Sequence, residues 1–306
     1  MSEESTADVP DDPGAARTEL LEWYASEQRR FPWRETDDPY HLLVCEVMSQ
    51  QTQLDRVVEP WAAFIDRWPT VEALAAADRA DVVGFWSAHR LGYNNRARYL
   101  HDAAQRLVEV YDGTFPETPD GLQDLAGVGP YTARALAAFA FGADAAVVDT
   151  NVKRVLHRAY SVPDADSAFE AAANRLLPTD RPRDWNEAMM ELGGTVCEPA
   201  PRCEEAPCPW RDRCDAYASG EFSAPDVPTQ AAYDGSRRQF RGRVVRALEE
   251  ADELPLSRLG PRVRVDYAPD GQHGRHWLRD LLADLAEDGL VEVDEGDGEA
   301  VARLAR

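Results

Sequence analysis

The 306-residue sequence has little lysine, since Lys153 is the only one in the chain. It also has no uninterrupted apolar run approaching the ~18 residues of a membrane span. Its acidic N-terminal stretch lacks the basic region and apolar core of a secretion signal. We therefore expect no membrane segment and a cytoplasmic location.

Positive charge is scarce as well, because 33 Lys and Arg residues face 56 Asp and Glu residues and the formal net charge is −23. A protein that binds nucleic acid normally presents an excess of cations to phosphates, so this balance alone argues against such a ligand. The acidic residues are spread over every segment, as in the proteomes of salt-loving organisms. In concentrated salt, local basic clusters can still decide where a ligand binds.

Cysteine is also rare, but four of the five cysteines lie within residues 197–214. Clustering in a cytosolic chain favours a metal over a disulfide framework. Four thiolates this close could hold zinc or a [4Fe–4S] cluster. The spacing is not the paired C-x2-C of common zinc ribbons, so we expect the cluster. The predicted ligands are Cys197, Cys203, Cys208 and Cys214.

Sustained period-two alternation is absent before residue 220, where helical periodicity predicts a mainly α fold. Apolar residues at helical spacing predict a largely buried helix over Tyr40–Val58. A second helix is predicted over Pro130–Phe141, which opens with proline at a favoured first helical position. A third begins near Asp149.

Composition divides the chain into four predicted regions. We expect a disordered acidic tail over residues 1–16, a helical domain with the cysteine loop over 17–220 and a polar linker over 221–237. Residues 238–306 show the pattern helix, short helix, long helix and hairpin, which resembles a small α+β winged helix-turn-helix domain.

Two glycines mark a tight turn between predicted helices, in the sequence Leu125-Ala-Gly127-Val-Gly129-Pro-Tyr131-Thr. Such a hairpin would point backbone N–H groups outward at the start of the next helix, where a DNA phosphate could bind without its sequence being read. The glycines alone favour a plain helix-helix turn, so the interpretation depends on what surrounds them.

Two carboxylates complete the candidate chemistry. Asp149 lies where a helix begins, and the helix dipole and N-terminal N–H groups are expected to keep its carboxylate ionised. Glu46 lies among apolar residues, so desolvation would raise its pKa, although a salt bridge to Arg34 explains its position about equally well. One protonated and one ionised carboxylate is the pair that glycosidic cleavage requires.

Together these motifs resemble the endonuclease III and MutY superfamily of helix-hairpin-helix DNA glycosylases, from about Trp23 to Cys214. In that superfamily the hairpin, a catalytic aspartate and a four-cysteine loop follow in this order. The resemblance implies a two-lobed helical glycosylase domain. It is closest to the MutY-type adenine DNA glycosylases, because Phe31–Arg34 matches LPWR, Glu46–Gln53 matches EVMLQQTQ, and Asn186–Gly193 matches the stretch before the first cysteine.

The resemblance implies a role for each matched residue. Glu46 would protonate adenine at N7, Asp149 would stabilise the sugar cation, and Tyr131 and Asn151 would support that carboxylate and the water. Bifunctional members carry a lysine at the position of Tyr131, so a monofunctional enzyme is implied. The residues implied to hold the flipped adenine, the opposing base or the DNA backbone are Trp33, Arg34, Gln50, Gln51, Thr52, Leu91, Tyr93, Gly127, Gly129 and Glu187.

The chain also departs from that pattern. The usual cysteine spacing is C-x6-C-x2-C-x5-C, whereas the four cysteines here follow C-x5-C-x4-C-x5-C. In addition, residues 238–306 do not resemble the Nudix-like domain that reads 8-oxoguanine. We expect a monomeric adenine glycosylase acting on double-stranded DNA that contains a mismatch or oxidised guanine. A sister enzyme removing T or U opposite G, a non-catalytic DNA-binding regulator and a zinc-stabilised helical protein are the alternatives. Glu187 favours adenine, because its oxygens suit the exocyclic amine.

Overall fold

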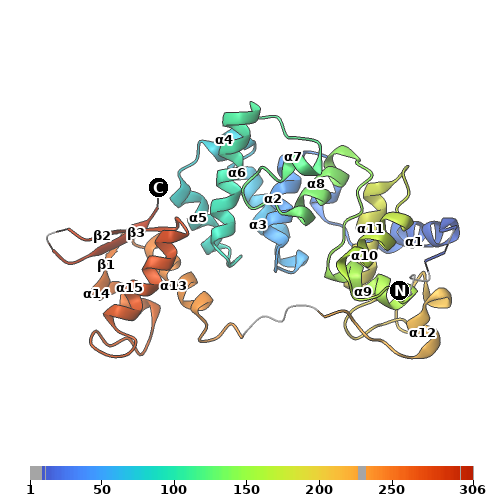
Figure 1. Ribbon diagram of the computed structural model, residues 1–306. Helices are drawn as coiled ribbons and strands as arrows, with labels where there is room; N and C mark the ends of the chain where they lie inside the picture. Colours follow the sequence, from blue (N-terminus) through green and yellow to red (C-terminus); the bar gives the residue numbers. More distant parts are fainter. Residues whose placement is uncertain (1–8, 11, 227–231, 297, 306) are drawn as a thin grey trace, which may run out of the picture. The chain divides into compact units, whose positions relative to one another are not determined.

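The computed structural model describes residues 9–10, 12–226, 232–296 and 298–305, and most of them are helical (Figure 1). Contacts divide the chain into two compact units. The first contains the described residues up to Leu43, then Pro116–Asp124, then those from Val128 to Asp226. The second contains Val44–Phe115, Leu125–Gly127 and the described residues from Ala232 onward. Among the described helices, none combines the length and apolar character needed to cross a membrane.

The first unit is built around one apolar core to which the N-terminal helix and the segment before the cysteine loop both contribute. Tyr24, Leu156, Phe169, Trp185 and Trp210 are all buried there. Its elements are α1 (Gly14–Glu27), η1 (Pro32–Glu35), α7 (Pro119–Leu122), α8 (Pro130–Phe141), α9 (Thr150–Tyr160), α10 (Asp166–Leu176), α11 (Pro182–Thr195), η3 (Arg211–Arg213) and α12 (Asp215–Ser219). Helix α2 (Pro39–Ser49) crosses from this unit into the second.

The second unit begins with short helices whose starts are fixed by side-chain caps. Thr70 and Asp78 accept hydrogen bonds from first-turn N–H groups of α4 and α5, which satisfies donors that a helix leaves unpaired. Its elements are η2 (Leu54–Arg56), α3 (Val58–Arg67), α4 (Val71–Ala75), α5 (Arg79–Ala88), α6 (Asn95–Tyr111), α13 (Arg237–Glu249), β1 (Glu253–Pro255), α14 (Leu256–Val263), α15 (Arg275–Glu287), β2 (Val291–Asp294) and β3 (Val301–Leu304).

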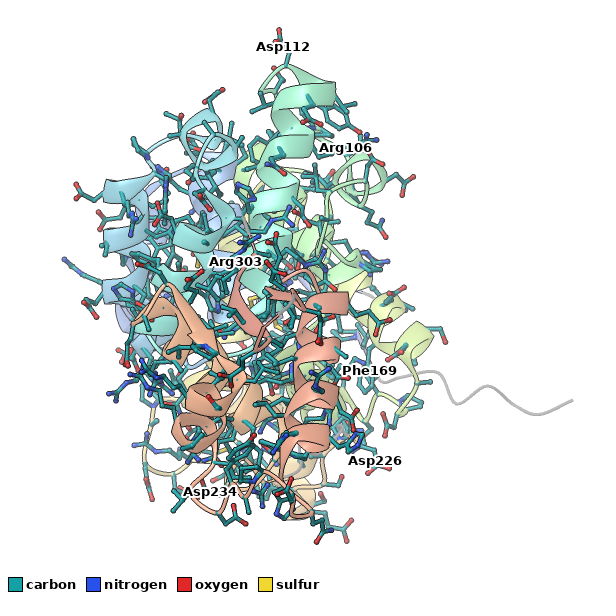
Figure 2. All side chains as sticks on the ribbon, turned by 90° about the vertical axis from the view of Figure 1, so that its left-hand side faces the viewer. Arg106, Asp112, Phe169, Asp226, Asp234 and Arg303 are labelled. Carbon is teal, nitrogen blue, oxygen red and sulfur yellow. The ribbon has the colours of Figure 1, made fainter. Side chains whose placement is uncertain are left out.

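The C-terminal part of this unit carries a small antiparallel sheet in the order β1-β3-β2. Glu292 and Arg303 are register partners on β2 and β3, and their side chains form an ion pair across the strands at 2.8 Å. Figure 2 labels Arg303. Helices α13 and α15 bury their leucine and valine faces beside it. The predicted helix, short helix, long helix and final hairpin are therefore confirmed as α13, α14, α15 and β2–β3, and β1 is a strand that was not predicted.

The predicted helix over Tyr40–Val58 is wrong in its second half. Helix α2 ends at Ser49, Gln51 adopts a left-handed backbone with φ of 58°, and a new helix begins at Val58. The cause lies outside the segment, because the buried Arg96 guanidinium donates to the carbonyl oxygens of Val47, Met48 and Gln50 where the helix stops. Helices α8 and α9 occur as predicted.

The predicted N-terminal tail needs a correction at its end. Helix α1 begins at Gly14, and Val9 and Ala16 are buried in the core of the first unit, since both side chains are apolar and pack there. The remainder of that prediction, residues 1–8 and 11, lies outside the described residues, as does 227–231 of the predicted linker. The other domain boundaries stay predictions.

Candidate active site

Asp149 caps the start of α9 as the sequence predicts. One carboxylate oxygen accepts a hydrogen bond from the backbone N–H of Val152 at 2.7 Å, and the other accepts from the Asn151 side-chain amide at 2.9 Å. Asn151 in turn accepts from Arg154 at 2.8 Å, so its amide can only donate toward the carboxylate. The predicted supporting role of Asn151 therefore has the required geometry.

Two opposing effects act on the pKa of Asp149, namely burial and the hydrogen bonds of the helix cap. Burial raises the pKa of Asp149, while the N–H of Val152 and the Asn151 side chain act to lower it, and the net direction is upward. The N–H groups at the helix start act in the expected direction, and desolvation by burial, which the sequence did not indicate, acts against them. A positive charge next to this carboxylate would favour its ionised form.

The segment that leads into Asp149 is fixed by a residue that we did not predict. Asn186 on α11 is buried, accepts a hydrogen bond from Val147 N–H and donates to the carbonyl oxygen of Ala145, both at 2.9 Å. These two bonds replace the strand pairing that an extended segment otherwise needs. Asn186 thus positions the backbone just before the candidate catalytic aspartate.

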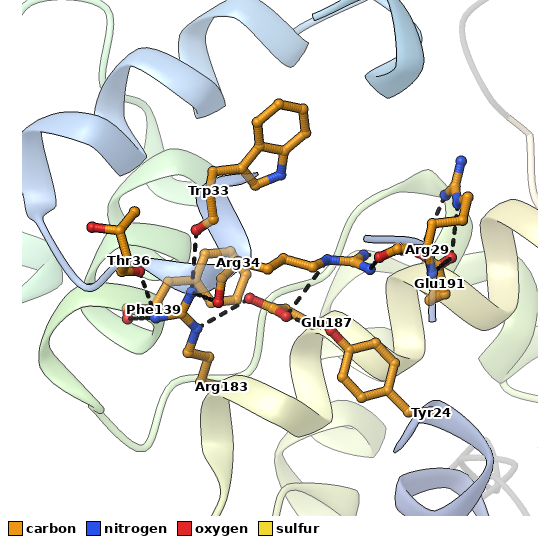
Figure 3. Close-up of polar contacts among 9 residues, drawn as sticks. All are labelled: Tyr24, Arg29, Trp33, Arg34, Thr36, Phe139, Arg183, Glu187 and Glu191. Atoms are coloured by element: carbon orange, nitrogen blue, oxygen red, sulfur yellow. Dashed lines mark hydrogen bonds and ion pairs between the residues drawn. The ribbon is translucent and has the colours of Figure 1, made fainter. Parts of the chain in front are cut away.

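Glu187, which is also on α11, lies in a buried ion-pair network (Figure 3). Its carboxylate accepts from the Tyr24 hydroxyl at 2.5 Å and from Arg183 Nε at 3.1 Å, and Arg34 Nε lies 3.6 Å away. Arg34 and Glu187, both among the residues that the resemblance implies to hold the DNA, therefore lie side by side. Trp33 joins the network through its backbone, since its carbonyl oxygen accepts from Arg183 at 3.3 Å.

A second carboxylate, Glu191, completes this network. Its side chain is fully buried and accepts from Arg29 at 2.7 Å and Arg34 at 2.8 Å. Burial acts to raise the pKa of Glu191, but the hydrogen bonds from both arginines outweigh it and hold the pKa below its usual value. Glu191 is therefore a fixed anion that holds Arg34 in place.

Sequence reasoning identified only part of this network and missed Tyr24, Arg29, Arg183 and Glu191. A signal was available on α11, because Arg183, Glu187 and Glu191 follow each other at four-residue spacing and so share one helix face. Burial and Glu187 raise the pKa of Tyr24, so its hydroxyl stays a donor. The two Glu187 oxygens have more acceptor positions than these donors fill, so further N–H groups can bind there.

Glu46 lies on α2 in the second unit, half-buried between the buried Cys45 and Val47. Asp149 lies in the first unit, so the meeting of the two carboxylates stays a prediction. The alternative partner proposed for Glu46, Arg34, forms its ion pairs with Glu187 and Glu191.

The residues expected to touch the opposing base are held together by Arg96, which sequence reasoning missed. Besides the carbonyls at the end of α2, its guanidinium donates to the carbonyl oxygens of Leu91 at 2.7 Å and Gly92 at 3.2 Å and lies 3.4 Å from Thr52 Oγ1. One cation therefore fixes both segments, Gln50–Thr52 and Leu91–Tyr93. Burial lowers the pKa of Arg96 to about 10, so it remains charged at neutral pH.

The glycine turn has the conformation that its sequence predicts. Gly127 has φ of 74°, and an added Cβ would lie 2.7 Å from Tyr99 Cβ, so only glycine fits there. Gly129 precedes Pro130 at the start of α8, and nothing lies within 4 Å of where its Cβ would be. Tyr131 follows in the first turn of that helix and is half-buried.

The four cysteines lie on one loop that α9 holds in place. The buried guanidinium of Arg158 donates to the carbonyl oxygens of Glu198 at 2.6 Å and Pro199 at 3.0 Å, and lies 3.6 Å from Cys197 Sγ. Trp210, also buried, anchors the loop through a hydrogen bond to the carbonyl oxygen of Ala16. These contacts connect the loop to α9 and α1.

The thiols form a donor set that needs a cation. Burial raises the pKa of Cys203, of Cys214, and of Cys208 to about 12, and charge on neighbouring cysteines adds to the effect. Close, desolvated thiols ionise only when positive charge compensates them, which iron or zinc would do. Among the described residues, no group of three or more His, Cys, Asp or Glu side chains has the geometry to hold a metal ion.

Lys153 lies on α9 and pairs with Asp166 at 2.5 Å. It is the only lysine in the sequence, and the candidate Schiff-base position is Tyr131. The first unit therefore offers no lysine amine at that position for covalent chemistry.

Comparisons with known proteins agree with the geometry. Residues 44–179 match the family described as HhH-GPD superfamily base excision DNA repair protein. The chain is similar to the adenine DNA glycosylase of Mycolicibacterium smegmatis, with 38% identity over 90% of this chain and 92% of that protein. It is 39% identical to the human adenine DNA glycosylase over 72% of this chain, which is 44% of the longer human protein.

Solved structures show the same fold. A thermostable thymine-DNA glycosylase superposes with a TM-score of 0.61 and 28% identity, over 68% of this chain and 97% of that one. An endonuclease III trapped in a covalent complex with DNA superposes with a TM-score of 0.57 over 67% of this chain and 94% of that one, and its 22% identity supports the fold alone.

Proposed function

The chain belongs to the adenine DNA glycosylases within the HhH-GPD superfamily of base excision repair proteins, and from this premise we propose that it removes adenine mispaired with guanine or 8-oxoguanine. The reaction is hydrolysis of the N-glycosidic bond. The observation that carries the proposal is Asp149, a half-buried carboxylate at the start of α9 that accepts two hydrogen bonds. The substrate is double-stranded DNA from which the adenine has been flipped.

The first chemical step breaks the bond between C1′ and N9 of adenine. Glu46 gives its proton to N7 of the base, so the electron pair of the breaking bond stays on a base that leaves without net negative charge. The sugar becomes an oxocarbenium ion. The Asp149 carboxylate faces that positive charge, which in turn favours its ionised form despite the burial that raises its pKa.

The second step adds water. The water oxygen bonds to C1′, its proton passes to the Glu46 carboxylate, and the products are free adenine and an abasic site. Asn151 keeps Asp149 oriented through its amide, and Tyr131 shares in placing the water. Because Tyr131 stands where bifunctional relatives have lysine, the strand is not cut, and the enzyme is monofunctional.

The ion-pair network on α11 supplies the selectivity for adenine. Glu187 accepts from the exocyclic amine, which thymine and uracil lack, and a site built to bind an N–H donor discriminates strongly against bases without it. Arg34 and Trp33 line the same pocket. Gln50, Gln51, Thr52, Leu91 and Tyr93 fill the gap that the flipped base leaves or touch the opposing base, and Gly127 and Gly129 bind the backbone.

We also propose that Cys197, Cys203, Cys208 and Cys214 hold a [4Fe–4S] cluster. The support is the donor set itself, four cysteine thiols on a loop fixed by Arg158 and Trp210, in three of which burial raises the thiol pKa. The iron of the cluster would compensate the negative charge of the thiolates, and the bonds to the four cysteines would make the loop rigid. A brown preparation with broad absorption near ~400 nm is expected, whereas a colourless, zinc-containing one would contradict the cluster.

One experiment tests the activity most directly. Duplex oligonucleotides carrying A:8-oxoG, A:G, T:G or U:G are incubated with the protein and then cleaved with alkali. We expect cleavage only of the two adenine-containing duplexes, and only after alkali. Activity on T:G or U:G alone would assign the protein to the sister class, and binding without release from any duplex would favour the non-catalytic regulator.

A further inference from the structure

The second unit contains an arginine-lined groove that the proposed reaction does not use. It runs between the loops around Gln51 and Leu91–Asn95 on one side and α13 on the other, with a volume of about 890 Å³. Seven of its lining residues are arginines and one, Asp288, is acidic. In a chain with a net charge of −23, this groove is a local reversal of charge. We call it the α13 groove.

The arginines of the α13 groove differ in how far they are neutralised. Arg237 pairs with Asp284 at 2.5 Å, and Arg241 pairs with Asp288. Arg56, Arg90 and Arg246 are exposed and form no ion pair with another residue that the structure describes. Their charges therefore remain available to an anionic ligand.

The backbone of the groove wall is strained where it faces this space. Gln51, Arg90 and Tyr93 have positive φ values of 58°, 54° and 47°, which non-glycine residues rarely adopt. The buried Arg96 holds these turns in place through the carbonyl oxygens of Gln50 and Leu91. Strain maintained in this way is concentrated at binding sites, where it fixes a geometry that the ligand requires.

A glycine inside α13 gives a second, independent indication. Gly242 lies one turn from Arg238 and one turn from Arg246, so the three share one helix face. An added Cβ at Gly242 would meet only the Tyr233 hydroxyl, 3.9 Å away, so internal packing does not require a glycine. A helix interior without a side chain permits close approach of a ligand to the backbone.

We propose that the α13 groove binds the phosphate backbone of duplex DNA beside the opposing base. This inference rests on the proposed function, because that function supplies the anionic duplex. It assigns the DNA-binding face to α13, the first helix of the C-terminal module (the described residues from Ala232 onward), and not to α14 and α15, which would form the helix-turn-helix pair of that module. The unpaired Arg56, Arg90 and Arg246 contact phosphates, and Gly242 lets the backbone come close.

The same groove connects the C-terminal module to the base-contacting loop. Arg238 donates to the Tyr93 hydroxyl at 2.7 Å, and its guanidinium lies 5.2 Å from the centre of the Tyr93 ring. Arg96 lies over that ring as well, at 5.5 Å. Tyr93 is thus held between two cations, one of which comes from α13, so backbone binding and the position of Tyr93 are coupled.

The test uses the full-length protein and an undamaged duplex, so that binding is measured without base release. The groove variant carries Arg56→Ser, Arg90→Ser and Arg246→Ser. The matched control carries Arg258→Ser, Arg262→Ser and Arg275→Ser, which remove the same charge from α14 and α15. Fluorescence anisotropy over a series of salt concentrations gives the affinity and its salt dependence.

We expect the groove variant to bind about 30-fold more weakly and to have a shallower slope of log K against log salt, by about 2 to 3, as three lost phosphate contacts predict. The control should stay within about threefold of the parent. Lysine at the same three positions should restore most of the affinity, because lysine also binds phosphate. If the triple variant fails to fold, Arg246→Ser alone should lower the slope by about one.

Equal binding by the groove variant and the parent would overturn the proposal, as would a loss in the α14 and α15 control as large as in the groove variant. Neither result would contradict the proposed glycosylase activity. Conversely, a parent that binds DNA through this groove but releases no adenine would remove the proposed function and keep the groove.

Discussion

Arginine has two different roles in the two compact units. In the first unit, Arg29, Arg34 and Arg183 are paired with two buried carboxylates, Glu187 and Glu191. In the second unit, the α13 groove has seven arginines and only one acidic residue in its lining. The paired arginines are fixed in a geometry, whereas the unpaired ones retain charge that a ligand can neutralise.

The difference shows why total charge is a poor guide to the ligand of this chain. A cation between buried carboxylates has already been neutralised, and it contributes specificity through hydrogen-bond direction. A cation on a groove wall contributes attraction that depends on salt. The acidic surface leaves both arrangements intact, because each is decided by neighbours within a few ångströms. Substitutions that impair base release or base selection should therefore leave duplex binding largely intact, and substitutions that impair duplex binding should act through the α13 groove.

The largest expected effect separates catalysis from binding. Asp149→Asn keeps the cap of α9, since asparagine is an equally good N-cap residue, but removes the negative charge that faces the oxocarbenium ion. We expect the single-turnover rate of adenine release to fall about a thousandfold. Glu46→Gln, which removes the proton donor, should have a similar effect.

Both variants should bind an A:8-oxoG duplex nearly as tightly as the parent, since neither residue lines the α13 groove. Anisotropy and alkaline cleavage on the same samples measure the two properties. A parent-like rate in either variant would contradict the mechanism, and a large loss of affinity would contradict the separation of roles.

The second prediction concerns stability in the paired region. Glu191→Gln leaves Arg29 and Arg34 without their fully buried anion, and breaking one partner of a buried pair destabilises by about 3 kcal/mol. The pKa of Glu191 is lowered in the folded state, so its contribution is complete above the ordinary glutamate pKa and is lost as the pH falls through the lowered value. The variant should therefore lose part of the parent's acid sensitivity.

Urea unfolding at pH 7 and at pH 3 measures this difference. Glu205→Gln is the matched control, because its ion pair with Arg202 is exposed and should not change the unfolding midpoint. If both variants unfold alike, the buried network does not stabilise the protein.

The third prediction uses the balance of forces at Asp149. Asn151→Ala removes a donor that favours the carboxylate form, so the pKa of Asp149, which burial already raises, should rise further. The acid limb of the rate profile should then move to higher pH, with a modest loss at the optimum. Single-turnover rates across a pH series test this. An unmoved acid limb would mean that Asp149 does not control it.

The sequence predicts those features that depend on local signals. Helix α9 begins with a capping aspartate, α8 begins with proline, and the strands β2 and β3 are neighbours in the chain, so each is specified within a few residues. The family motifs likewise identify Glu187 as a candidate for adenine. These predictions need no knowledge of distant contacts.

Features that depend on distant residues were not predictable in this way. The break after α2 is caused by Arg96, more than forty residues along the chain. The strand β1 has three residues and exists because it pairs with β3 near the other end of the module. Which arginines of α13 remain unpaired depends on Asp284 in α15 and on Asp288 at its C-terminal end, so no pattern within α13 itself distinguishes them.

The smallest expected effect is also the most specific test of the α13 groove. Gly242→Ala should stabilise the protein by up to about 1 kcal/mol, because alanine is the better helix former and the added Cβ meets nothing closer than 3.9 Å. In the proposed groove the same methyl group occupies the space where the phosphate backbone approaches α13. The variant should therefore unfold at a higher temperature and yet bind undamaged duplex several-fold more weakly. A purely structural glycine predicts that stability and binding change in the same direction or that binding does not change. The reverse control is Ala247→Gly on the buried face of α13, which should lower the stability and leave the affinity unchanged. Gly220→Ala is not a suitable comparison, because φ of 75° at Gly220 strains any side chain.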